Sequence, residues 1–264
     1  MVSAAKMRKA QEAAEQTEPY SNKIHQMVSE LASGVDSRLH RLLRSGNPEG
    51  KTLIILISTN KGLCGGLNTS LFRKTTAWLL SRTISDLEFI TLGTKGGQFV
   101  IRSKWSLSAD FSKQHQETDA VPAITQLFVN GYIDGIYKEV FVVFNRFVNS
   151  LKQEPVMDQV LPIAIPTDES EPETTSEDWH GFIIEPSARS VLNKLLPHYV
   201  ETQIRSAILE AEASEHSARM VAMKNATDNA KNLIGDLTLL YNRKRQEQIT
   251  TEIADIVTAR ESMR

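Results

Sequence analysis

Residues 201–263, ETQIRSAILEAEASEHSARMVAMKNATDNAKNLIGDLTLLYNRKRQEQITTEIADIVTARESM, decide the fold of this chain. From Pro197 to Met263 there is no further proline, and Gly235 is the only glycine. This composition predicts one helix of roughly 65 residues, which would be on the order of 100 Å long. A chain of 264 residues needs such a helix only if the helix pairs with another.

A seam of apolar and small residues follows one face of this predicted helix. Its members are Ile204, Ile208, Ala211, Ala218, Ala222, Ala226, Leu233, Leu237 and Leu240. Small side chains let two helices approach closely, as in a coiled coil. The seam stops at residues 242–248, which include no apolar residue, and it resumes at Ile249, Ile253 and Ile256. The polar gap suggests that this stretch faces a different partner.

The N-terminal arm has the composition of a helix over residues 3–44. Its apolar residues recur every three or four positions: Ile24, Met27, Val28, Leu31 and Val35. Pro19 should kink or interrupt this helix, and the Gly46–Gly50 stretch should end it. We expect the N-terminal and C-terminal helices to pair as an antiparallel coiled coil, with the middle of the chain inserted between them.

The middle of the chain alternates between strands and helices, which predicts a small Rossmann-like α/β domain with a mainly parallel sheet. Strands are expected at 52–58, 87–92, near Trp105 and at 139–144, and helices from about Asn68 and over 119–130. The side chains of the Asn68 region should cap the N-terminus of the helix that begins there. A hairpin-like pair is expected at 151–161 and 181–184, with a solvated acidic loop at 166–178. The predicted parts are therefore 1–45 (helix), 51–190 (α/β domain) and 191–264 (helix).

Charge and composition exclude several classes of protein. The formal net charge is -2, so no basic excess exists to bind nucleic acid. Cys64 is the single cysteine, which excludes an intrachain disulfide and a multi-cysteine metal site. The longest apolar run, 53–57, is too short to span a bilayer.

The glycine-rich turn at 62–66 lies where a nucleotide-binding fold holds phosphate. Its sequence fits neither the dinucleotide nor the P-loop motif, and Asp86 precedes the second strand rather than following it. A tight strand-to-helix turn explains these glycines better. Cys64 has no histidine close in sequence to activate it. We therefore predict no catalytic residue, no cofactor and no metal, and we leave open whether residues 243–245 form a solvated helix face or a partner contact.

Four blocks of sequence resemble the gamma subunits of F-type ATP synthases. They are AKMRKAQ (5–11), ISTNKGLCGGLN (57–68), SEHSARMVAMKNATDN (214–229) and YNRKRQEQITTEI (241–253). The blocks occur in the family's order and cover essentially the whole chain.

The resemblance implies a non-catalytic rotary shaft, the central stalk that couples proton or other ion transport to ATP synthesis. In that family a coiled coil lies inside a ring of alpha and beta subunits, and the α/β domain contacts the epsilon subunit and the membrane c-ring. The complex would be peripheral on the cytoplasmic face of a bacterial-type plasma (inner) membrane. Carried over by position, the subunit contacts are Arg245, Gln246, Thr250 and Glu252 for one beta-subunit loop. The remaining contacts, near acidic segments of the beta subunits, are Lys6, Arg8, Lys9 and Cys64.

One departure from the family concerns the N-terminus. Members begin several helical turns before the block that here follows Met1, so we expect a shortened first helix. Two alternatives therefore stay open. One is a truncated or degenerate gamma-like coiled-coil adaptor without a rotary role, and the other is a cytosolic nucleotide-dependent α/β enzyme.

Overall fold

A computed structural model describes residues 2–33, 40–82, 86–112, 117–163, 185 and 187–263. The chain divides into two units, Met1–Met220 and Val221–Arg264. Its elements are, in order, α1 (Val2–Ser33), β1 (Lys51–Ile57), α2 (Leu67–Ser81), β2 (Leu87–Leu92), α3 (Thr94–Arg102), β3 (Ser106–Asp110), a 3-10 turn (Glu117–Ala120), α4 (Val121–Ile133), β4 (Tyr137–Phe147), β5 (Gln153–Leu161) and α5 (Ala188–Ser262).

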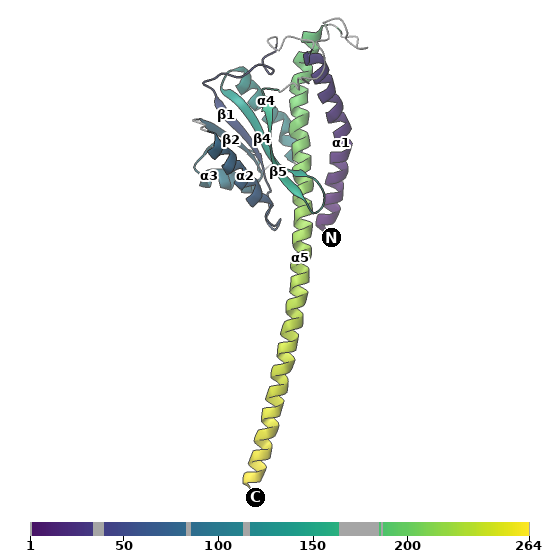
Figure 1. Ribbon diagram of the computed structural model, residues 1–264, viewed down its shortest axis with the longest axis vertical. Coiled ribbons are helices and arrows are strands. Elements are labelled where there is room, and N and C mark those ends of the chain that lie inside the picture. Colours follow the sequence, from purple (N-terminus) through teal and green to yellow (C-terminus); the bar gives the residue numbers. More distant parts are fainter. Residues whose placement is uncertain are drawn as a thin grey trace. The chain divides into compact units, whose positions relative to one another are not determined.

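The five strands form one sheet in the order β3-β2-β1-β4-β5 (Figure 1). The first three pairings are parallel, with Ile55 beside Ile90 on one side and beside Val142 on the other. The β4–β5 pairing is antiparallel, so these two strands form a hairpin. The predicted α/β fold with a mainly parallel sheet is confirmed.

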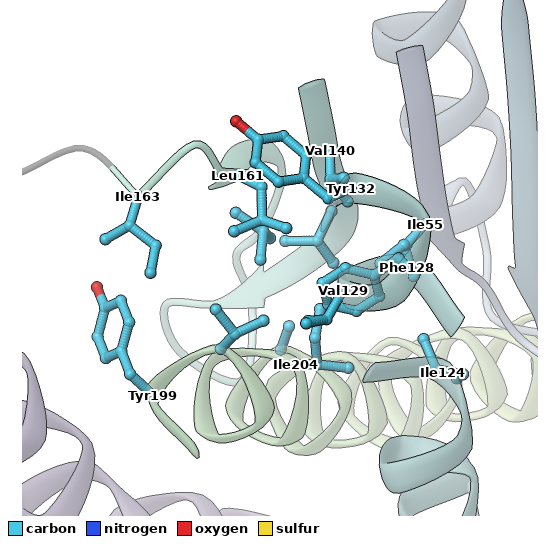
Figure 2. Packing of buried hydrophobic residues seen from close by; sticks show 14 of the residues in the cluster. Ile55, Ile124, Phe128, Val129, Tyr132, Val140, Leu161, Ile163, Tyr199 and Ile204 are labelled. Carbon is cyan, nitrogen blue, oxygen red and sulfur yellow. The ribbon is translucent and has the colours of Figure 1, made fainter. Parts of the chain in front are cut away.

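Strand β1 is buried on both faces, as its unbroken apolar run predicts. Because side chains alternate along a strand, odd- and even-numbered residues enter different layers. Leu53, Ile55 and Ile57 belong to a cluster that includes buried residues of α1, α4 and α5. Figure 2 shows part of this cluster, with Ile55 and Phe128 near Ile204 of α5. Ile54 and Leu56 pack in the other layer with α2 and α3.

Helices α1 and α5 pair antiparallel within the first unit (Figure 1). The Tyr20 hydroxyl lies 2.6 Å from Nε2 of His198, and Nδ1 of His25 lies 2.9 Å from the Tyr199 hydroxyl. Lys6 precedes Tyr20 by fourteen residues in α1, and its charge acts on Glu212, which follows His198 by fourteen residues in α5. The two helices therefore run in opposite directions. The predicted antiparallel pairing is confirmed for this part of α5.

The N-terminal helix ends earlier than expected. We predicted helix as far as residue 44, but residues 41–43 form a turn; the described part of α1 reaches Ser33, and residues 34–39 lie outside the described residues. Leu42 is fully buried, and its carbonyl oxygen accepts a hydrogen bond from the backbone N–H of Ile163. Tertiary packing and this long-range bond therefore override the local helix propensity.

Pro19 and Pro197 lie in the interior of helices. Pro19 does not divide α1, and α5 begins at Ala188, so Pro197 lies inside it instead of preceding it. The strand predicted at 181–184 and the acidic loop at 166–178 lie outside the described residues. No helix in the described part of the chain is both long enough and apolar enough to cross a membrane.

Candidate functional site

The turn after β1 is built on polar contacts beneath an exposed surface. Asn68 donates from Nδ2 to the Thr59 hydroxyl (2.7 Å), and this Nδ2 lies 3.6 Å from the Cys64 sulfur. Cys64 is buried, whereas Leu63 is 73% exposed and has a positive φ of 63°. Asn68 therefore braces the turn and does not cap α2. The N-cap of α2 is Gly66, which makes no side-chain cap bond, so the predicted capping role was wrong.

The glycines of this turn are not packed against the rest of the chain. A Cβ added to Gly62, Gly65 or Gly66 would meet no other atom within 4 Å. Only Gly65 of these three has a positive φ, 61°. The tight-turn explanation therefore holds for Gly65 and leaves Gly62 and Gly66 unexplained within this chain. Their backbone is open to close approach from outside.

Three residues of α5 lie at the ends of β1 and β4. Ser214 donates from Oγ to the carbonyl oxygen of Asn145 (2.8 Å), and Ser217 donates to that of Ser150 (2.8 Å). Arg219 donates to the carbonyl oxygens of Lys61 (3.2 Å) and Gly62 (3.3 Å).

Ligands of open α/β sheets bind at the carboxyl ends of the strands, where the strand order reverses. Here the reversal lies between β1 and β4, and the side chains of Ser214, Ser217 and Arg219 bond there to the backbone of the chain itself. This edge of the sheet is therefore occupied by α5 of the same chain.

Beside this contact lies a cluster of charged groups from α1 and α5. Glu215 pairs with Arg219 at 2.5 Å, with both side chains less than a fifth exposed. Burial raises the pKa of Glu212, the Glu215 carboxylate raises it further, and Lys6 of α1 opposes the shift. Burial also lowers the pKa of His216; Glu215 opposes this shift, while Arg219 and Lys6 add to it. Glu212 and His216 thus both lie where charge is disfavoured.

Lys6, Arg8 and Lys9 are exposed on α1. Lys6 is linked to the Cys64 turn through side chains of α5. The charge of Lys6 lowers the pKa of His216, and the guanidinium group of Arg219 contacts both His216 and the turn. Lys61 to Leu63 and the two glycines at 65 and 66 are the exposed part of the turn, whereas Cys64 is buried.

The second unit contains the other four expected contact residues, Arg245, Gln246, Thr250 and Glu252, and all are exposed. Thr250 donates from Oγ1 to the carbonyl oxygen of Gln246 (2.9 Å). Arg243 and Lys244 both pair with Glu247. This pairing raises the pKa of Lys244 and lowers that of Glu247, chiefly through their hydrogen bond.

Arg245 forms no ion pair with the described residues, so its guanidinium group is available to a partner. Large exposed apolar side chains flank this polar stretch on both sides: Leu233, Ile234, Leu237, Leu239, Leu240, Tyr241, Ile249, Ile253, Ile256 and Val257. Such a series of exposed apolar side chains is typical of an interaction surface.

Sequence reasoning missed the roles of Ser214, Ser217 and Arg219. They belong to a block quoted for its resemblance, but their partners are backbone carbonyls of other elements, which leave no mark on the sequence. As for metals, the described residues include no group of three or more His, Cys, Asp or Glu side chains that could hold an ion.

Comparison with known proteins decides the family. The model of the ATP synthase family matches residues 1–263. The gamma chain of the ATP synthase of Dehalococcoides mccartyi is 41% identical over 261 residues, covering 97% of this chain and 89% of that protein. This chain belongs to the ATP synthase gamma-chain family. The gamma chain of Polaromonas naphthalenivorans is similar at 39% identity, with the same coverage.

Solved structures share the fold. A chain of the central stalk and c-ring of the mitochondrial ATP synthase of Tetrahymena thermophila gives a TM-score of 0.61 at 20% identity, over 86% of this chain and 96% of that one. A chain of the mitochondrial ATP synthase of Euglena gracilis in rotational state 3 gives 0.61 at 19% identity, over 98% and 95%. The fold shared with these solved chains consists of an N-terminal and a C-terminal helix with an α/β domain inserted between them.

Proposed function

We propose that this chain is the central rotary shaft of an F-type ATP synthase and couples ion transport through the membrane ring to ATP synthesis or hydrolysis. The observation that carries this proposal is the match to gamma chains at about 40% identity over 97% of the sequence. The paired helices and α/β domain fit a shaft, because two packed helices resist twisting better than one. The chain itself is a non-catalytic subunit.

The partners follow from the same proposal. They are the alpha and beta subunits of the catalytic head, the epsilon subunit and the membrane c-ring. The chain would then be a peripheral part of a membrane-associated complex, on the cytoplasmic face of the plasma membrane. The similarity to the Dehalococcoides and Polaromonas chains, at 41% and 39% identity, supports that proposed placement.

The proposed contact with one beta subunit consists of Arg245, Gln246, Thr250 and Glu252. Their exposure, and the absence of an ion pair to Arg245 within the described residues, leave their polar groups available to a second chain. Charge-assisted hydrogen bonds are about twice as strong as neutral ones, so a few of them can bias one catalytic site.

A second proposed contact, with acidic segments of the beta subunits, consists of Lys6, Arg8 and Lys9 together with the Cys64 turn. All three basic side chains are exposed, and so is the backbone of the turn at Gly62 and Gly65. Because Cys64 is buried, the neighbouring residues Lys61 to Leu63 would provide the contact at this turn.

The coupling mechanism follows from asymmetry. One shaft cannot contact three identical beta subunits equally, so each step of rotation favours a different conformation at each catalytic site. The nucleotide affinity of a site then changes by the free energy of that contact.

The alternative hypothesis, a nucleotide-dependent enzyme, is disfavoured because α5 bonds to the ends of β1 and β4, where the strand order reverses and a nucleotide would bind. The reading of a coiled-coil adaptor predicts no effect on catalysis. To test the proposal, the chain is combined with the alpha and beta subunits of the same organism. We expect an assembled complex with ATPase activity that depends on this chain; assembly without such dependence would favour the adaptor.

A further inference from the structure

We propose that Ser214, Ser217 and Arg219 form a clamp that fixes the rotational setting of α5 against the sheet. In this role they are positioning residues through which torque passes between the α/β domain and α5. The inference rests on the proposed function. It adds the site at which the α/β domain of this chain holds α5.

The clamp joins one short segment of helix to three separate pieces of backbone. Ser214 bonds to Asn145 near the end of β4, and Ser217 bonds to Ser150 in the β4–β5 hairpin. Gln153 of β5 reaches the Ser217 hydroxyl from its Nε2 atom (3.5 Å). Arg219 bonds to Lys61 and Gly62 in the turn after β1.

These contacts hold the helix from opposite sides. Successive residues of an α-helix are about 100° apart around its axis. Ser214 and Ser217 are therefore about 60° apart and face β4 and its hairpin together. Arg219 is about 160° from Ser217, so its side chain reaches the β1 turn from the far flank of the helix. A turn of α5 in either direction about its axis stretches at least one of these bonds.

Helix α1 lies near the flank of the segment that carries Arg219, because Glu212 and His216 are within about 60° of Arg219 around the helix. Glu212 and His216 are one turn apart on α5, and Lys6 of α1 acts on both. The Glu215–Arg219 ion pair restrains the guanidinium group on that flank and aims it at the turn. The segment is thus enclosed by α1, by the β1 turn and by the β4–β5 hairpin.

The change in chemistry along α5 explains why a clamp is needed here. Earlier in α5, large apolar side chains pack into the core: Leu192, Leu196, Val200, Ile204 and Ile208. At 213–217 the fully buried residues are Ala213, Ser214 and Ser217. Small side chains bury little area and interlock poorly, whereas hydrogen bonds depend on direction. Directional bonds can therefore fix the angle of the helix where packing cannot.

The test asks whether the variants hydrolyse ATP without pumping ions, which is called slip here. It uses the complete complex, reconstituted into vesicles. The variants are Ser217→Ala with Arg219→Ala, and the milder Arg219→Lys, which keeps the charge but lacks the forked donor. Arg205→Ala is the matched control, because Arg205 forms an i,i+4 pair with Glu201 on the same helix, at 3.0 Å. Two quantities are measured: ATP hydrolysis in leaky vesicles, and the largest ion gradient that ATP hydrolysis can sustain, read with a pH-sensitive dye and with labelled sodium.

A clamp that yields under load lowers the sustained gradient without lowering unloaded hydrolysis. For the double variant we expect hydrolysis within about twofold of the parent and a gradient at least about threefold smaller. Arg219→Lys should fall between the double variant and the parent, and Arg205→Ala should match the parent.

A double variant that sustains the parental gradient overturns the clamp. So does a proportional fall of hydrolysis and gradient in both clamp variants, because that result indicates loss of enzyme and not slip. An equal fall in Arg205→Ala overturns it too. A parent chain that supports no ATP-driven transport would instead contradict the proposed function, and this outcome is read before any variant is compared.

Discussion

Gly93 lies directly against the backbone carbonyl of Ser58, so closely that no side chain fits between them. The φ of Gly93 is +91°, a conformation that other residues rarely adopt. The Ser58 hydroxyl accepts a hydrogen bond from the N–H of Gly96 (2.7 Å), which holds the start of α3 against the end of β1. The two glycine-rich stretches therefore differ: Gly93 and Gly96, at the start of α3, are packed against Ser58, whereas the turn at 62–66 is open.

Gly93→Ala should destabilise the isolated chain strongly, because the new Cβ meets both a strained φ and a backbone oxygen. We expect a loss of about 3 kcal/mol or more in the free energy of unfolding. Urea denaturation followed by circular dichroism measures it. Gly62→Ala is the matched control and should cost less than about 1 kcal/mol, since its Cβ meets nothing. Equal losses in the two variants would contradict the distinction between the packed glycine at the start of α3 and the open turn at 62–66.

Arg245→Ala combined with Gln246→Ala should leave the fold of the isolated chain unchanged but impair turnover of the assembled complex. Both side chains are exposed, so folding loses little. A charge-assisted hydrogen bond to a partner contributes roughly 1.5–3 kcal/mol, enough to shift one catalytic site about tenfold or more relative to the others.

The measurement for this pair is ATPase activity after reconstitution with alpha and beta subunits. Arg243→Ala is a suitable control, because Arg243 is paired with Glu247 within the helix. Parental turnover from a fully assembled double variant would refute the contact assignment, though not the family membership.

Glu212→Gln should raise the melting temperature of the chain at neutral pH. The folded-state pKa of Glu212 is raised, by burial first and then by Glu215, and Lys6 reduces the shift. A raised carboxyl pKa means that the stability contribution is complete below the unfolded value, about 4.3, and is lost as the pH rises through the folded value. Glutamine stays neutral, so the gain should disappear as the pH falls to about 4.

The control for this effect is Glu247→Gln. The pKa of Glu247 is lowered by its hydrogen bond to Lys244, so its carboxylate favours the folded state above the unfolded pKa. Its replacement should therefore not raise the melting temperature at neutral pH. Melting curves of both variants at several pH values check the signs, and a Glu212→Gln protein that melts lower than the parent at pH 7 would contradict the assignment.

The isolated chain should bind neither ATP nor NAD tightly. The edge of the sheet where a nucleotide would lie is bonded to Ser214, Ser217 and Arg219 of α5. Calorimetry should detect no binding at micromolar nucleotide. A saturable heat signal in that range would revive the enzyme reading.

Backbone amides of residues 221–262 should exchange with solvent faster than those of β1 in the isolated chain. Within the second unit nearly every side chain is exposed, so this helix relies on local propensity, which is marginal. Strand β1 is buried on both faces. Hydrogen exchange read by mass spectrometry separates the two regions, and equal protection would be evidence against this account.

How far the sequence predicted the structure depended on whether local pattern or distant contact decided each element. The apolar run at 53–57 predicted a strand buried on both faces, because no other element suits so short and uniform a run. The turn at 41–43 could not be predicted, since it depends on Ile163, which is 121 positions further along the chain than Leu42.

The same reason explains the candidate site. Exposed basic and polar residues on helices were predictable from composition, but the bonds from Ser214, Ser217 and Arg219 depend on where β1 and β4 end. Asn68 was assigned a local role as a helix cap because Asn favours that position, yet its partner is Thr59, across the turn.

The two histidine–tyrosine pairs between α1 and α5 have a consequence for how the helices are aligned along their length. Each helix contributes one ring of each kind, Tyr20 and His25 from α1 and His198 and Tyr199 from α5. Sliding one helix by a full turn, about 5.4 Å, would separate both pairs at once. The pairs thus mark a single longitudinal register, and a deletion of one turn between Tyr20 and His25 would leave only one of the two pairs in place.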